Sequence, residues 1–124
     1  MSVILNMDLF VDTRYEEVAR IFQLCIDQIQ KGKGMERHGT QEKFTNQVTW
    51  KIITECKGFA KGQMLKKALE SCRFNDIDAE IKEMIGAVNY GIFEIMRLIE
   101  LKGEDGKKLL NDTRDQYIES LKQL

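Results

Sequence analysis

Residues 76–102 read DIDAEIKEMIGAVNYGIFEIMRLIELK, and this stretch decides the fold. Its apolar residues recur mainly at intervals of three and four, which is the spacing of one face of an α-helix. Asn75 or Asp76 can cap the first turn, and Gly103 follows the last one. The stretch therefore predicts the longest helix of the chain, reaching Lys102. Its continuous apolar stripe consists of Ile77, Ile81, Met84, Ile85, Val88, Ile92, Ile95 and Ile99.

Two glycines, Gly86 and Gly91, lie in the middle of this predicted helix. Each costs about 1 kcal/mol of helix stability relative to alanine. Glycines at such positions usually allow another helix or a ligand to approach closely, so we expect a neighbour there. The polar residues Glu80, Glu83, Tyr90 and Glu94 line the side opposite the apolar stripe.

Four further helices are predicted around the longest one, at about 13–30, 40–57, 59–73 and 105–124. The first begins with a capping-box pattern, Thr13-x-x-Glu16. We expect Trp50 and Ile53 on the surface, and Glu55 close to the inner face of its helix. The side chains expected to face the core are Val18, Phe22, Cys25, Ile26 and Ile29 in the first helix, Phe44, Val48, Ile52 and Cys56 in the second, and Met64, Leu65, Ala68, Leu69 and Cys72 in the third.

The N-terminal residues 1–11 alternate in a period of two, which is typical of a β-strand. A lone strand needs a partner for its backbone groups, and the same strand of another copy would supply one in an oligomer. The alternative is an extended arm over the helices. The sequence thus predicts one all-α domain over 1–124, a bundle of four to five helices. It comprises a strand or arm (1–11), a helical core (13–102) and a C-terminal helix (105–124).

The composition of the chain argues against nucleic acid, a membrane and zinc as partners. The chain has 124 residues and a net charge of −1, which gives no electrostatic basis for general nucleic-acid binding. The apolar stretch Val3–Val11 is too short for a membrane span. The three cysteines are widely spaced and form no zinc pattern, so we expect buried, reduced thiols and a cytoplasmic location. They are Cys25, Cys56 and Cys72.

The glycine-rich stretch Lys31–Gly39 (KGKGMERHG) predicts an anion site. Its glycines leave backbone N–H groups uncovered, its cations add charge, and Thr40 begins the next predicted helix. It matches neither a Walker loop nor a dinucleotide fingerprint. The alternative interpretation is a solvated connector. The candidate ligand-binding residues are Lys31, Lys33, Arg37, His38, Gly39, Lys43 and Tyr90.

The order of helix, lysine/glycine-rich loop and three helices, the last bearing Glu83–Tyr90 (EMIGAVNY), resembles the MazG-like nucleoside-triphosphate pyrophosphohydrolases over residues 13–101. The resemblance implies a four-helix core, dimers or tetramers, and acidic residues that hold Mg²⁺ beside a nucleotide. Gly86 stands where that family has an aspartate, and no Glu-x-x-Glu occurs in the second or third helix. For an enzyme, the candidate Mg²⁺ ligands are Glu55, Glu70, Glu80 and Glu83.

Three functions follow as expectations. The first is binding of a phosphorylated nucleotide without catalysis, of the kind by which small viral proteins sequester nucleotide signals of host defence. The second is Mg²⁺-dependent pyrophosphohydrolysis through the four glutamates. The third is a protein-interaction module whose contacts are Trp50, Phe93 and the N-terminal arm.

Overall fold

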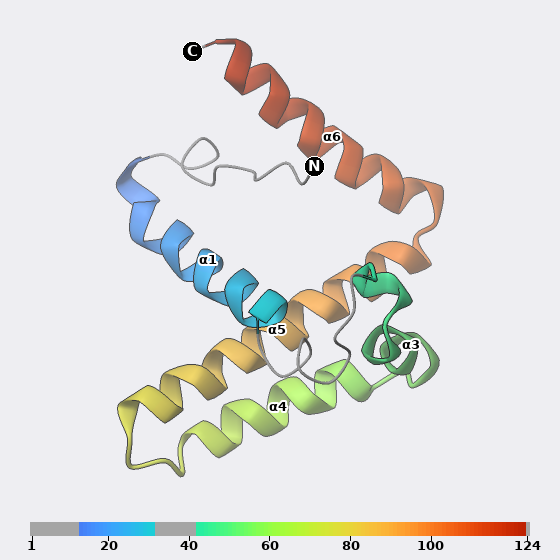
Figure 1. Cartoon of the computed structure of the whole chain (residues 1–124). Coiled ribbons are helices and arrows are strands. Elements are labelled where there is room, and N and C mark those ends of the chain that lie inside the picture. Colours follow the sequence, from blue (N-terminus) through green and yellow to red (C-terminus); the bar gives the residue numbers. More distant parts are fainter. Residues whose placement is uncertain (1–12, 32–41, 124) are drawn as a thin grey trace. The chain divides into compact units, whose positions relative to one another are not determined.

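The computed structural model of the chain describes residues 13–31 and 42–123, and in these ranges it contains helices and turns (Figure 1). The predicted all-α class is confirmed. The strand or arm predicted at 1–11 lies outside the described residues. The α-helices are α1 (Glu16–Lys31), α3 (Val48–Glu55), α4 (Phe59–Ser71), α5 (Ile77–Leu101) and α6 (Glu104–Lys122), and the 3-10 turns are η2 (Thr13–Tyr15) and η3 (Phe44–Asn46).

Most helix boundaries agree with the periodicity. Asp76 caps α5 as predicted, because its Oδ1 accepts a hydrogen bond from the backbone N–H of Asp78 at 3.0 Å. The prediction of one helix over 40–57 is wrong in the described part. Gln47 has extended backbone angles (φ −82°, ψ 156°), so it separates the 3-10 turn η3 from the short helix α3.

The described chain divides into two compact units. The described part of the first unit comprises residues 13–23 and 99–123, and buries Ala19 and Tyr117. Gly103 links α5 to α6 with a left-handed φ of +64°, which favours glycine. Gly106 lies so close to the preceding turn that a Cβ atom there would be 2.0 Å from the carbonyl oxygen of Ile99. The turn into α6 therefore depends on both glycines.

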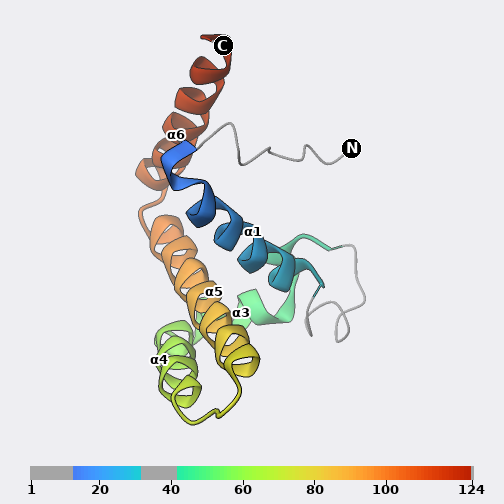
Figure 2. The same cartoon turned by 90° about the vertical axis from the view of Figure 1, so that its left-hand side faces the viewer.

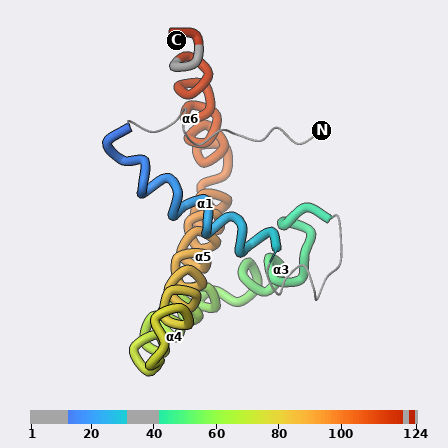
Figure 3. The backbone as a smooth tube through the Cα atoms, turned by 60° about the vertical axis from the view of Figure 1, so that its left-hand side comes forward, coloured from blue at the N-terminus to red at the C-terminus, as the bar shows by residue number. Residues whose placement is uncertain are grey.

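The second unit, residues 24–98, is built on an antiparallel pair of helices, α4 and α5 (Figures 1 and 3). Near their connection, Ser71 Oγ lies 3.4 Å from Met84 Sδ. Both mid-helix glycines of α5 face α4, as expected. A Cβ on Gly86 would lie 3.0 Å from the Lys67 side chain, and a Cβ on Gly91 would lie 3.3 Å from Met64 Sδ. Small residues thus let the two helices approach closely.

The core of this unit lies where α3, α4 and α5 meet. Its buried members are Trp50 and Ile53 of α3, Ala60 of α4 and Phe93 of α5. Ile53 is completely buried, with 0% of its surface exposed. The expectation that Trp50 and Ile53 lie on the surface is therefore wrong. Partly buried residues around this core are Ile29, Phe44, Phe59, Tyr90, Ile92 and Met96.

The expected inner faces are also wrong for several helices. Leu65 and Leu69 of α4 are exposed, and so are Val48 and Ile52 of α3. Most of the predicted stripe of α5 is exposed too. Helix α5 instead buries its opposite side, which carries the small residues that admit α4. The buried residues of α5 are Gly86, Ala87, Asn89, Phe93, Glu94 and Arg97.

Exposed side chains also include residues predicted to be buried in other elements. Cys25 is buried, as predicted, but Cys56 and Cys72 are exposed. They are the C-cap residues of α3 and α4, and so follow the helical residues that these two helices bury. In α1, Val18 and Phe22 are exposed. The burial of Cys25 raises the pKa of its thiol.

Candidate functional site

Described residues before and after the predicted anion-binding segment pack on the same core. Ile29, two residues before the end of α1, packs against the cluster of Trp50, Ile53, Ala60 and Phe93. Phe44 packs against the same cluster and stacks on Phe93, with ring centroids 4.6 Å apart. Figure 2 shows α1 and α3, the α-helices before and after this segment. The two anchors, Ile29 and Phe44, flank residues 32–41, which lie outside the described part.

Three of the predicted ligand residues are described, namely Lys31, Lys43 and Tyr90. Lys31 ends α1 and Lys43 immediately precedes Phe44; both are exposed. Tyr90 is half-buried and meets Phe59 and Phe93 edge-to-face, at centroid distances of 6.1 and 5.7 Å. The structure therefore places Tyr90 in the same aromatic cluster as Phe44, the residue that follows Lys43. The other predicted ligand residues, Lys33, Arg37, His38 and Gly39, lie outside the described residues.

The aromatic rings form a connected cluster. Phe44 contacts Trp50 at a centroid distance of 5.7 Å, in addition to Phe93. Tilted and edge-to-face rings contribute about 0.5–1.5 kcal/mol per pair beyond the burial of their area. The rings of Phe44, Phe93 and Trp50 pack against one another within the core. Of the cluster, Tyr90 is the predicted ligand residue, and its half-buried ring lies where the core meets the surface.

A buried ion pair lies on the same helix. Arg97 Nε donates a hydrogen bond to Glu94 Oε1, one helical turn away, and both side chains are at least 90% buried. Lys61 Nζ of α4 lies 3.9 Å from Glu94 Oε2. The hydrogen bond from Arg97 lowers the pKa of the Glu94 carboxyl; burial opposes this shift, and the charges of Arg97 and Lys61 add to it. The pair stays charged because each member supplies the other's counter-charge.

Two buried oxygens on α5 accept no hydrogen bond from the described residues: Glu94 Oε2 and Asn89 Oδ1. Asn89 is tied on its other side, because its Nδ2 donates to the backbone carbonyl of Cys25 in α1 at 3.1 Å. This contact between residues 64 positions apart holds the C-terminal part of α1 against α5. Both oxygens keep an acceptor capacity that water or a ligand donor can use.

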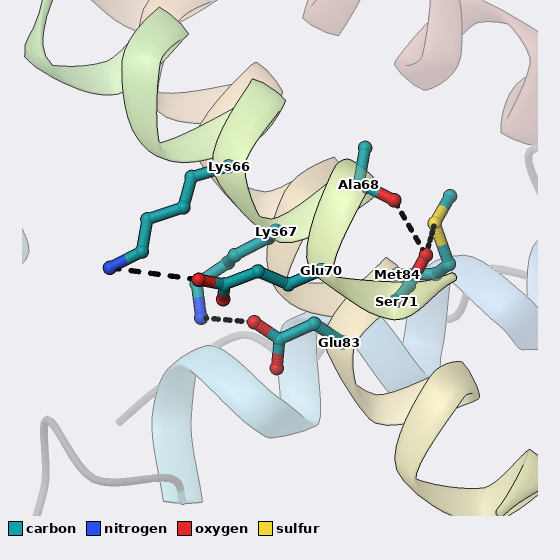
Figure 4. A network of polar contacts seen from close by, with 7 residues as sticks. All are labelled: Lys66, Lys67, Ala68, Glu70, Ser71, Glu83 and Met84. Carbon is teal, nitrogen blue, oxygen red and sulfur yellow. Dashed lines mark hydrogen bonds and ion pairs between the residues drawn. The ribbon is translucent and has the colours of Figure 1, made fainter. Parts of the chain in front are cut away.

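Two of the predicted metal ligands are engaged by lysines (Figure 4). Glu83 Oε1 of α5 lies 3.2 Å from Lys67 Nζ of α4, and this pair is partly buried. Glu70 Oε1 lies 4.0 Å from Lys66 Nζ, within α4. A Mg²⁺ ion at Glu83 would have to displace an ammonium group that already neutralises the carboxylate. The surroundings of Glu70 and Glu83 therefore suit ion pairs, one within α4 and one between α4 and α5, better than a metal.

The other two predicted metal ligands, Glu55 and Glu80, belong to no group of described side chains that could hold a metal ion. Glu55 is exposed at the end of α3, so the expectation that it lies close to the inner face is wrong. Glu80 is half-buried in the first turn of α5. Within residues 13–31 and 42–123, there is no group of three or more His, Cys, Asp or Glu side chains that could hold a metal ion. The described residues do not fit the Mg²⁺ site that the resemblance implies.

Sequence reasoning missed Asn89 and Arg97, and treated Glu94 only as part of a polar side. The signal was present as Glu94-x-x-Arg97, an oppositely charged pair at i, i+3, next to the aromatic residues Tyr90 and Phe93. This pair was overlooked because it lies on the side opposite the apolar stripe, and the stripe was expected to face the core.

In the part of the chain that the structure describes, no helix combines the length and apolar character that a membrane crossing requires. Comparisons with protein-family models, with curated proteins and with solved structures find no match for this chain.

Proposed function

We propose that this chain binds a phosphorylated nucleotide without hydrolysing it. The observation that supports the proposal is that Ile29 and Phe44, which flank the glycine-rich segment in the sequence, pack on one core. Lys31 and Lys43 are close in sequence to these two residues. Tyr90 contacts the same core through Phe93. In this proposal the segment binds the phosphates and the Tyr90 ring packs against the base.

In this proposal the phosphates contact Lys31, Lys33, Arg37, His38 and Lys43, and backbone N–H groups of the glycines. Gly39 allows the chain to approach the anion closely. The exposed part of the Tyr90 ring supports the base. Lys31 and Lys43 suit this role because they are exposed and pair with none of the described carboxylates. Both cations are then available to an anionic ligand.

Binding without hydrolysis is favoured by the lysine pairing of Glu83 and Glu70. The alternative, a Mg²⁺-dependent pyrophosphohydrolase of the MazG-like kind, needs those carboxylates free. Sequestration of a nucleotide signal, as in viral counter-defence, is the biological setting that such binding would serve. The proposal also includes a cytoplasmic location and a homo-oligomer.

The test incubates the purified full chain with linear and cyclic nucleotides and Mg²⁺, then identifies the small molecules released on denaturation by mass spectrometry. We expect an intact nucleotide. Recovery of a monophosphate with pyrophosphate would establish hydrolysis instead. If no nucleotide is retained or cleaved, the proposal is wrong.

The placement of the site is tested by calorimetric titration of the retained nucleotide. Lys31→Ala with Lys43→Ala should weaken binding by about tenfold per lysine, as expected for hydrogen bonds to a charged group. A matched control removes two exposed lysines of α6, Lys107→Ala with Lys108→Ala, and should leave the affinity unchanged. Equal effects of the two double variants would reject this placement. A third pair, Lys33→Ala with Arg37→Ala, tests the segment between the anchors.

A further inference from the structure

We draw no further inference here: the strongest candidate, the side-chain cluster in which Lys61 of α4 meets the buried pair of Glu94 with Arg97 on α5 and leaves Glu94 Oε2 without a hydrogen bond, carries nothing because its charges already pair with one another and, in the part of the chain that the structure describes, nothing shows which ligand would occupy it.

Discussion

Helix α5 buries polar side chains on one side and exposes apolar side chains on the other, which is the reverse of most surface helices. The side that is buried within the chain carries Asn89, Glu94 and Arg97 among small residues and Phe93. The side that faces outward carries isoleucines, a valine, a methionine and a leucine in a regular stripe. A monomeric protein usually buries the apolar side of such a helix and solvates the polar one. Helix α5 instead buries its polar side and leaves most large side chains of its apolar side exposed.

The difference shows that the two sides pack for different reasons. On the buried side, Gly86 admits α4, and the side chains of the ion pair of Glu94 with Arg97 are at least 90% buried. On the other side, Gly91 faces Met64 of α4, while Val88 and Ile95 are 42% and 57% exposed. The polar side thus belongs to the packing of residues 24–98, which uses only part of the apolar side.

The largest effect should come from breaking the core that covers the polar side. Ile53→Ala removes a fully buried side chain of α3 and should lower the free energy of unfolding by about 2–5 kcal/mol, because it leaves a cavity. The measurement is urea unfolding: the midpoint concentration should fall while the slope of the unfolding free energy against urea concentration stays the same.

The matched control is the neighbouring residue Ile52, which is 38% exposed in the same helix. Ile52→Ala makes the same chemical change with the same effect on helix propensity. It should cost less than about 1 kcal/mol, since little of its contact area lies in the core. Equal losses from the two substitutions would mean that the outer side of α3 is covered as well.

An intermediate effect should come from neutralising the buried carboxylate. Glu94→Gln removes one charge of the pair with Arg97 and should lower the free energy of unfolding at neutral pH by about 1.5–3 kcal/mol. The native pKa of Glu94 lies below its ordinary value of 4.5. The stabilisation is therefore complete above pH 4.5 and is lost as the pH falls through the native pKa.

Urea unfolding of both chains between pH 7 and pH 3 tests this pH dependence. The difference between the unmodified chain and Glu94→Gln should be constant near neutrality and shrink in acid. Other carboxylates titrate in both chains and cancel in the difference. A difference that grows as the pH falls would show that Glu94 is protonated in the native state, and would contradict the assignment of a charged pair.

The contrast between the sides of α5 also shows what the sequence could predict. The intervals of three and four residues, with Asp76 and Gly103 at the ends, were enough to predict the existence and length of α5. Periodicity shows that a helix has an apolar side, but not what covers that side. The prediction of the inner face failed because a strong stripe was assumed to face the chain's own core.

The candidate site was predictable to a similar degree. The glycines and cations of residues 31–43 predict an anion site from composition alone, whereas the packing of Ile29 and Phe44 on one core appears only in the structure. Trp50 illustrates the same limit. As a lone aromatic off the predicted stripe it suggested a surface contact, yet η3 and the short helix α3 turn it into the core.

The smallest effect should come from the second ion pair on the polar side, between Lys67 and Glu83. Its side chains are 28% and 20% exposed, so water screens the pair more than it screens Glu94 and Arg97. A double-mutant cycle with Glu83→Gln and Lys67→Met should give a coupling energy of about 0.2–1 kcal/mol, and added salt should reduce it. A salt-independent coupling above about 2 kcal/mol would mean that water is excluded there. The pair of Lys67 with Glu83 would then be as well shielded as the pair of Glu94 with Arg97, and the ranking of the two ion pairs by exposure would fail.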